Sequence, residues 1–388
     1  MKIHLYGNVL NWAYQFGTYL RTLGHDVRVF VDARETSPLY QPAWEHGESR
    51  ELPDWIETVD VRFNRLLWPG AREREFLKKL GECDLIQTFG EYAVWAWRSG
   101  APYVVLSYGG DLEILPFAKG NLKERVLGGL VTHALRRAQA FVYAIPSHHG
   151  LVRQLKIKQA TFNPHAVPID TSRWMPAPEE DRCRLRARYS QHRVFFHGAR
   201  QEWTFKDAND KGNDRLFRAF ARFVQNDCPD SLLIAVERGR DLAHSKALVA
   251  ELKLSQNVVW SKALTKPDLL TMLNSVDGFF DQFIHGYFGV ASLEALSCGV
   301  PTFLKLRRDG TDGVVLPPVL NVSTEDEIHR AMCEVDQAER MRSLRGASRK
   351  WAVTYHDWRV VMDWYVGVYR DVLAGRGGAE CQSTPERC

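Results

Sequence analysis

The sequence predicts an α/β protein made of two Rossmann-like domains, each with a parallel sheet between layers of helices. A short apolar strand at residues 3–6 ends at Gly7, and a helix with one apolar face follows at 9–23. A second apolar strand comes next at 27–31. This order of strand, glycine turn, helix and strand is typical of a doubly wound domain. The order begins again with the apolar strand at 193–197, which indicates a second domain.

Apolar runs and helical periods predict the remaining elements in chain order. In the first half, further strands are expected at 84–89, 102–107, 140–145 and 160–163, and helices at 92–98, at 122–137 and after Pro146. In the second half, further strands are expected at 231–236, 258–260, 278–282 and 301–306. Helices are expected there after Gly212, after Thr265, after Gly289, at 325–335, at 337–355 and from His356. Four prolines break residues 33–80 into loops and short elements.

The junction of the two halves is expected where Pro176, Pro178 and the charged run 179–182 indicate exposed chain. The last residues are rich in glycine, serine and charge without any period, which is typical of disorder. The expected parts are therefore an N-terminal domain at 1–175, a C-terminal domain at 176–355, a last helix at 356–374 and a disordered tail at 375–388.

The composition excludes several classes of protein. With 388 residues, 45% of them apolar and 25% charged, the chain has the make-up of a globular protein of two or three domains. A formal charge of +4 is too small for a nucleic-acid-binding protein. The seven cysteines form no C-x-x-C pair, which argues against a disulfide framework or a zinc site and favours a cytoplasmic chain. No apolar run approaches the roughly 18 residues of a membrane span, so at most peripheral contact with the inner face of a membrane is expected.

The helix expected at 122–137 carries several cations. Lys123 and Arg125 lie near its start, and Arg136 and Arg137 lie at its end. Such a helix can contact anionic lipid. Solvated charge on a domain surface is the more common use of these residue types.

A glycine-rich stretch at 286–301 lies between two apolar strands. A helix that opens at Gly289 presents unpaired backbone N–H groups and the positive end of its dipole, which together favour an anion such as phosphate. Glu294 lies further along this helix among apolar neighbours, where a carboxylate without a partner would be costly and a ligand hydroxyl would be suitable. An ordinary surface glutamate is the alternative.

Three motifs of this stretch are Phe288-Gly289, Leu293-Glu294-Ala295 and Cys298-Gly299-Val300-Pro301. Together they resemble the signature segment of the group 1 glycosyltransferases, a retaining family of GT-B architecture. The resemblance implies two domains facing a cleft, with the C-terminal helix crossing back to the N-terminal domain. It also implies that the helix N-terminus holds the donor diphosphate and that Glu294 holds the nucleotide ribose. The implied donor-binding residues at this helix are Tyr287, Phe288, Gly289, Val290 and Ala291.

The resemblance departs from the family pattern at Gly286, and Tyr287 stands where a glycine is usual. The family usually carries another glutamate eight positions before the one equivalent to Glu294, and that position is Gly286 here. Asp281 and His285 are the candidates to replace it, and a structural role is equally open for each.

Two cations flank the turn after the strand at 193–197. Arg200 follows Gly198, and Lys211 precedes Gly212. Paired cations suit a diphosphate leaving group, which gains charge as the glycosidic bond breaks. The resemblance implies the same, because the family carries an Arg and a Lys-Gly here as its diphosphate clamp. Two solvated surface cations are the alternative.

The resemblance also implies a base pocket and an acceptor region. The nucleobase would lie along residues 260–264, with Lys262 and Leu264 as binding residues. In the first half, Tyr108-Gly109-Gly110-Asp111 resembles the family's His-Gly-Ser-Asp turn, although a plain turn explains the glycines almost as well. The residues implied near the acceptor are Asn8, Tyr108, Gly109, Asp111 and His165, with Asp281 and His285 from the second half.

The expected function is transfer of a sugar from an NDP-sugar to a glycan, lipid-linked or small-molecule acceptor, with retention of anomeric configuration. Arg200, Lys211 and Glu294 are the expected catalytic residues. No metal and no cofactor are expected, because cations and a helix dipole would stabilise the leaving group, and the base, uridine or guanosine, is undecided. The alternatives are a GT-B sugar-nucleotide epimerase or phosphorylase-like enzyme, and a silent nucleotide-binding partner subunit.

Overall fold

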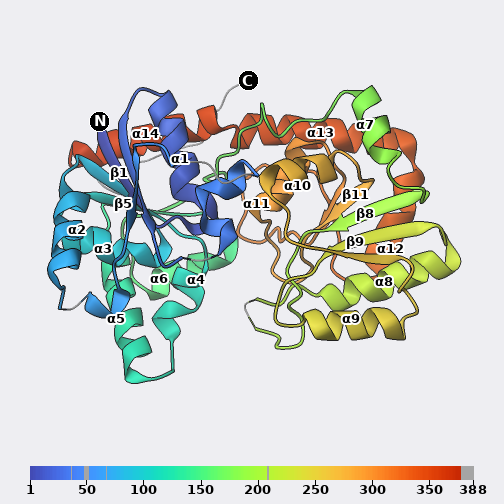
Figure 1. Ribbon diagram of the computed structural model, residues 1–388, viewed down its shortest axis with the longest axis horizontal. Coiled ribbons are helices and arrows are strands. Elements are labelled where there is room, and N and C mark those ends of the chain that lie inside the picture. The colour runs from blue at the N-terminus through green and yellow to red at the C-terminus, as the bar shows by residue number, and fades with distance from the viewer. Residues whose placement is uncertain (36, 48–51, 67, 208, 377–388) are drawn as a thin grey trace. The chain divides into compact units, whose positions relative to one another are not determined.

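The computed structural model describes residues 1–35, 37–47, 52–66, 68–207 and 209–376. The chain forms two compact units (Figure 1). Unit 1 combines Met1–Pro168 with the chain from Trp358 onward, and unit 2 is Ile169–Asp357. The expected division placed these boundaries after residues 175 and 355. The expected tail at 375–388 lies outside the described residues from 377 onward.

Unit 1 contains a sheet of seven parallel strands in the order β3-β2-β1-β4-β5-β6-β7. The strands are β1 (Lys2–Tyr6), β2 (Asp26–Asp32), β3 (Ile56–Val59), β4 (Leu85–Phe89), β5 (Tyr103–Leu106), β6 (Ala140–Tyr143) and β7 (Ala160–Phe162). Every residue of β4 is buried, as is usual for a parallel strand with both faces covered.

The α-helices described in unit 1 are α1 (Trp12–Thr22), α2 (Ala71–Gly81), α3 (Ala93–Ser99), α4 (Gly110–Glu113), α5 (Leu122–Arg137), α6 (His149–Gln154) and α14 (Trp358–Leu373). Helix α1 begins later than expected, because Leu10 and Asn11 adopt positive φ angles of 50° and 62°. Helix α2 lies in the region expected to contain only loops and short elements. Its buried Phe76 and Leu80 show that this expectation was wrong there.

The C-terminal helix α14 packs on unit 1, as the fold prediction required (Figure 1). The ring of Tyr365 lies edge-on to Phe16 of α1, with centroids 5.0 Å apart. The hydroxyl of Tyr369 donates a 2.9 Å hydrogen bond to Oε1 of Gln87 in the central strand β4. The aromatic face of this helix therefore completes the core of the first unit.

Unit 2 contains a sheet of six parallel strands in the order β10-β9-β8-β11-β12-β13. The strands are β8 (Arg193–His197), β9 (Ser231–Val236), β10 (Val258–Ser261), β11 (Gly278–Phe280), β12 (Thr302–Leu304) and β13 (Leu320–Asn321). The helices are α7 (Glu179–Arg186), α8 (Asn213–Asn226), α9 (Leu242–Glu251), α10 (Lys266–Leu273), α11 (Val290–Ser297), α12 (Glu325–Cys333) and α13 (Ala338–His356). Phe195, Phe280 and Phe303 pack together at the centre of this sheet.

The charged run after Pro178, which was expected to be exposed chain, forms helix α7, and none of its residues is buried. Acidic residues fill its first turn and arginines fill its last turn. This arrangement complements the helix dipole, so the charged run stabilises a surface helix that was not predicted.

Helix α5 begins and ends where it was predicted. Its apolar row is only partly covered, because Leu122 and Val126 are exposed whereas Ala134 is buried. In the described part of the chain, no helix is both long enough and apolar enough to span a membrane.

Each sheet reverses its strand order beside the first strand of its unit, between β1 and β4 in unit 1 and between β8 and β11 in unit 2. At such a point the loops that leave the carboxyl ends of the two strands diverge, and open α/β sheets bind their ligands there. The topology therefore gives each unit one candidate edge.

Candidate functional site

The candidate site of unit 2 lies where the loops after β8 and β11 meet. The backbone N–H of Phe283 donates to the carbonyl oxygen of Lys211 at 2.9 Å, which joins the two loops. Gly212 opens α8 with a φ of 68°, and a Cβ at this position would lie 3.2 Å from Ile284. A glycine therefore allows the Lys211 turn to lie directly against the β11 loop.

A buried histidine and asparagine organise the loop that carries the two predicted cations. Nδ1 of His197 lies 3.2 Å from the carbonyl oxygen of Phe280, so it donates and leaves Nε2 as an acceptor. Nδ2 of Asn213 donates to that Nε2 at 2.8 Å and to the carbonyl oxygen of Arg200 at 3.1 Å. Burial lowers the pKa of His197 to about 4, so the ring is neutral at physiological pH. Sequence reasoning missed this pair, although both residues flank the predicted turn.

Arg200 and Lys211 lie at the two ends of this loop. Nη2 of Arg200 donates to Oδ1 of Asn209 at 3.3 Å. Nζ of Lys211 lies 6.0 Å from the ring centroid of Tyr287, which belongs to the glycine-rich stretch. The structure thus brings Lys211 beside that stretch and ties Arg200 to its own loop.

Helix α11 opens at Gly289 as predicted, and an aspartate caps it. Oδ2 of Asp281 accepts a 3.2 Å hydrogen bond from the backbone N–H of Gly289 and a second one from the hydroxyl of Ser292. The N–H groups of Val290 and Ala291 lie in the first helical turn, where a helix offers no backbone acceptor. Asp281 therefore already interacts with the helix end that was predicted to hold a diphosphate.

Glu294 has a partner that sequence reasoning missed. Its side chain is 1% exposed and pairs with Nζ of Lys266, which is 13% exposed. That ammonium also lies 5.5 Å from the ring centroid of Trp174. Lys266 sits at the start of α10, where the sequence had drawn attention only to the helix cap of Thr265. A ligand hydroxyl is thus not the sole means of compensating the buried carboxylate.

Gly286 occupies the position at which the resembling family carries its additional glutamate. Its φ is +80°, and a Cβ built on it would lie 2.0 Å from Cγ of Arg307. The backbone N–H of Arg307 also donates to the carbonyl oxygen of Gly286 at 3.0 Å. The neighbouring His285 donates its backbone N–H to Oε1 of Gln282 at 2.8 Å. The arginine side chain fills the space that a glutamate side chain would need.

The other residues predicted to bind the donor also lie in unit 2. A Cβ on Gly198 would lie 2.8 Å from the Phe279 ring, so this turn packs closely on β11. Lys262 is exposed just after β10, and Leu264 is half-buried. The ring of Phe288 lies against α13, 5.7 Å from the Trp351 ring.

The candidate edge of unit 1 is organised by Tyr108. Its hydroxyl donates a 2.7 Å hydrogen bond to Oε2 of Glu91, which follows β4. Gly90 has a φ of +56°, and a Cβ there would lie 2.2 Å from the Tyr108 ring, so only glycine allows this contact. Burial raises the pKa of Glu91 to about 7, and the nearby charge of Asp111 contributes in the same direction. Sequence reasoning missed Glu91, and Gly90 before it was the only available signal.

Asp111 holds the turn that was predicted to approach an acceptor. Its Oδ1 accepts hydrogen bonds from the Ser107 hydroxyl at 2.9 Å and from the backbone N–H groups of Tyr108 and Gly109 at 3.2 and 3.0 Å. Gly109 has a φ of +112°. Among the described residues, the buried Oδ2 of Asp111 has no hydrogen-bond partner. One oxygen of this buried carboxyl group therefore holds the turn.

Asn8 and His165 occupy buried positions in unit 1. The Asn8 amide nitrogen donates to Oδ1 of Asn11 at 2.7 Å and to the carbonyl oxygen of Tyr40 at 2.6 Å. Its oxygen accepts from the N–H of Tyr14 at 3.0 Å. Burial lowers the pKa of His165 to about 4. The Asn8 side chain thus organises its own loop, and His165 is neutral.

One group of side chains among the described residues has the chemistry of a metal site. The ligand atoms of Asp227, His329 and Cys333 lie within 4.8 Å of one another. Asp227 ends α8, whereas Lys211 and Gly212 precede the start of that helix. This cluster is therefore separate from the loops at the carboxyl edge of the sheet.

Comparison with known proteins places this geometry in context. Solved structures of sucrose-phosphate synthase from Thermosynechococcus elongatus and of Anabaena HepE with UDP and glucose share the fold, with TM-scores of 0.70 and 0.68. They are 15% and 16% identical to this chain, and the matches cover 97% and 96% of it and 100% of each structure.

A sequence relative is the GDP-mannose:cellobiosyl-diphosphopolyprenol alpha-mannosyltransferase of Xanthomonas oryzae pv. oryzae (strain PXO99A). It is 27% identical over 154 residues, which are 37% of this chain and 40% of that enzyme's length. Residues 207–319, which include the Lys211 turn and all of α11, match the model described as glycosyl transferases group 1. This part of unit 2 is therefore similar to the group 1 glycosyltransferases.

Proposed function

We propose that this protein is a glycosyltransferase that moves a sugar from an NDP-sugar donor to an acceptor. The observation that carries the proposal is the arrangement at the carboxyl edge of unit 2. There the loop that bears Arg200 and Lys211 lies against the segment that opens α11, and Glu294 is buried on that helix.

In this proposal, the cations and the helix end stabilise the departing diphosphate. Negative charge grows on the leaving group as the glycosidic bond breaks, so contacts that strengthen with this charge accelerate the reaction. Lys211 and Arg200 supply positive charge, and the N–H groups of Val290 and Ala291 supply oriented donors. Asp281 competes for this helix end and keeps the turn in place when no donor is bound. The proposed reaction needs no metal and retains anomeric configuration.

Glu294 holds the nucleotide ribose in the same proposal. The Glu294 carboxylate pairs with Lys266, and a carboxylate is a strong acceptor for hydroxyl groups. Lys266 is then a positioning residue, because it acts on the donor through Glu294. The base stays open between uridine and guanosine: a HepE structure contains UDP-glucose, and the name of the Xanthomonas relative specifies GDP-mannose.

The acceptor side is proposed for the edge of unit 1 that carries Tyr108, Glu91 and Asp111. Asp111 lies close enough to raise the pKa values of Glu91 and Tyr108. A carboxyl group with a pKa of about 7, such as that of Glu91, can donate or accept a hydrogen bond, which suits recognition of acceptor hydroxyls. Glycans, lipid-linked sugars and small molecules all offer such hydroxyls.

The test is incubation of the purified chain with a panel of UDP- and GDP-sugars, with and without sugar acceptors. Release of NDP that requires an acceptor, together with a glycosylated product, is expected, and NMR of that product reports the anomeric configuration. Binding of every donor without turnover would instead identify a silent partner subunit. An isomerised sugar nucleotide would identify an epimerase, which the fold allows, because a Listeria monocytogenes structure titled a putative UDP-N-acetylglucosamine 2-epimerase shares it with a TM-score of 0.58.

A further inference from the structure

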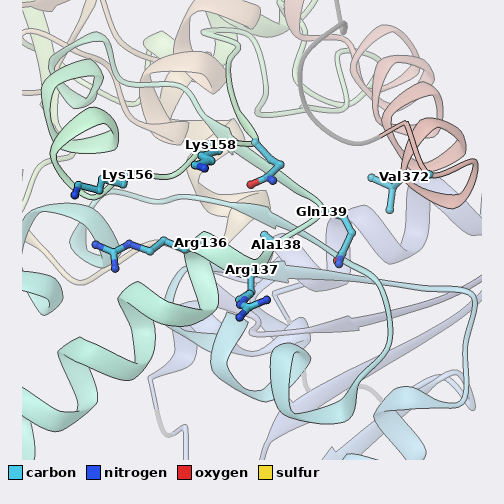
Figure 2. Close-up of a pocket in the computed structure, with 9 residues that line it drawn as sticks. Arg136, Arg137, Ala138, Gln139, Lys156, Lys158 and Val372 are labelled. Carbon is cyan, nitrogen blue, oxygen red and sulfur yellow. The ribbon is translucent and has the colours of Figure 1, made fainter.

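A pocket of about 650 Å³ lies at the amino edge of the sheet in unit 1 (Figure 2). Its walls come from the turn between α5 and β6, from the turn between α6 and β7, and from the end of α14. The lining residues are Arg136, Arg137, Ala138, Gln139, Lys156, Lys158, Gln159, Val372 and Gly375. These turns precede β6 and β7, so the pocket is at the opposite edge of this sheet from Tyr108 and Glu91.

The pocket has a strong excess of positive charge. Arg136, Arg137, Lys156 and Lys158 line it, and its lining includes no carboxylate. In the part of the chain that the structure describes, none of these four cations forms an ion pair with an aspartate or glutamate. Nε of Arg136 donates to the carbonyl oxygen of Leu155 at 2.6 Å, which holds it next to Lys156. All four cations are exposed to solvent, and a bound anion would reduce the repulsion between like charges that line one pocket.

Two glutamines add neutral polar groups to the pocket. Oε1 of Gln139 accepts from the backbone N–H of Tyr103 at 2.8 Å, so the other end of its amide, with two N–H donors, points away from that strand. Figure 2 shows Gln139 and Arg137 among the residues that line the pocket. The buried Oε1 of Gln159 has no hydrogen-bond partner among the described residues. The pocket therefore offers charged and neutral donors and one acceptor.

We propose that this pocket binds an anion that carries a diphosphate. A diphosphate on an organic group carries about two to three negative charges near neutral pH, so it compensates more of the four cations than a single phosphate with about one to two. Val372 and Ala138 form an apolar wall for the organic part of the ligand. The diphosphate belongs either to a soluble molecule or to the headgroup of a lipid. This proposal does not depend on the glycosyltransferase activity.

The test uses the full chain with Arg200→Ala and Lys211→Ala in place, so that the proposed donor site of unit 2 does not contribute. Titration calorimetry with inorganic pyrophosphate is compared before and after Arg137→Gln/Lys158→Gln. The matched control is Arg62→Gln/Lys78→Gln, which removes the same charges from exposed positions of unit 1 that line no part of this pocket. The pocket variant is expected to weaken binding by about tenfold or more, because charge-assisted hydrogen bonds are lost. The control is expected to bind as the parent does.

A second arm distinguishes the two sources of the diphosphate. The same variants are sedimented with phosphatidylcholine vesicles that contain or lack a polyprenyl diphosphate. If the pocket variant, but not the control, loses pyrophosphate binding and no variant binds the polyprenyl diphosphate vesicles, the ligand is soluble. If the pocket variant, but not the control, also loses binding to the vesicles that contain polyprenyl diphosphate, the ligand is a lipid headgroup. Equal behaviour of the pocket variant and the control in both arms would overturn the proposal, and matching thermal unfolding midpoints show that each variant is folded.

Discussion

The hydroxyl of Tyr108 donates a 2.7 Å hydrogen bond to Oε2 of Glu91 at the carboxyl edge of the sheet in unit 1. Burial raises the pKa of Glu91 from its ordinary value of 4.5 to about 7, and burial together with the nearby carboxyl groups raises the pKa of Tyr108. A buried carboxyl group that ionises near neutral pH links the stability of the fold to pH.

Glu91→Gln is expected to remove part of the pH dependence of stability. The folded protein holds the Glu91 proton more tightly than the unfolded chain does. The wild-type free energy of unfolding therefore falls as pH rises from about 4.5 to about 7, by roughly 1–3 kcal/mol. The glutamine does not titrate, so the free energy of unfolding of the variant should rise relative to that of wild type as pH increases. Urea denaturation at about pH 5 and about pH 8 measures this gain, and the exposed Glu82→Gln is the control. A stability difference that stays constant across this range would contradict the prediction.

Lys266→Met is expected to destabilise unit 2 because it leaves the buried Glu294 carboxylate without its cation. Removing one partner of a buried ion pair costs about 3–5 kcal/mol. The double variant Lys266→Met/Glu294→Gln should recover part of this loss, since no unpaired charge remains. Urea denaturation of the two single variants and the double variant forms a double-mutant cycle. Additive losses would show that the two side chains are not coupled.

Gly286→Glu is expected to destabilise unit 2 and to leave activity unimproved. The positive φ disfavours any side chain, and the added atoms would collide with Arg307, so a loss of about 1–3 kcal/mol is expected. Gly346→Ala in helix α13 is the control, because no atom lies within 4 Å of the new Cβ, and it should be neutral or stabilising. Thermal unfolding and turnover measure both effects. A stable and more active Gly286→Glu protein would show that the position tolerates the glutamate of the family.

Lys211→Ala and Arg200→Ala are each expected to lower turnover by about 10²-fold or more, because each removes a positive charge from the proposed leaving-group site. Lys206→Ala, in the same loop, is the control: its ammonium is 60% exposed and lies 3.4 Å from Oδ2 of Asp210, in the turn that precedes Lys211. Turnover with a saturating NDP-sugar is the measurement. Unchanged kinetics in both test variants would remove the proposed clamp.

Much of the fold could be predicted because its signals are local. Apolar runs ended by glycine, and helices such as α5 and α10, appear at the expected positions. The N-terminus of α11 was found in the same way, because Gly289 and the motifs after it lie within one short segment. Helix α7 was missed because a charged run is equally typical of exposed chain and of a surface helix.

The candidate site was predicted only in part. Lys211 and the glycine-rich stretch were expected together, and the Tyr287 contact and the Phe283 hydrogen bond join them. Lys266 was missed because 28 positions separate it from Glu294, so no spacing rule links them. Glu91 was missed because its environment is created by Tyr108 from the next strand.

The sequence by itself determined the alternation of strands and helices, the glycine turn that opens α11, and the presence of cations and a carboxylate suited to a diphosphate and a ribose. Only the tertiary structure decided which groups meet. It paired Lys266 with Glu294, placed Asp281 on the helix end, filled the space above Gly286 with Arg307, and gathered four cations at the far edge of unit 1. The physical reason is that periodicity and capping depend on neighbours a few positions apart, whereas burial, pKa and steric fit depend on side chains that the strand order brings together from distant parts of the chain.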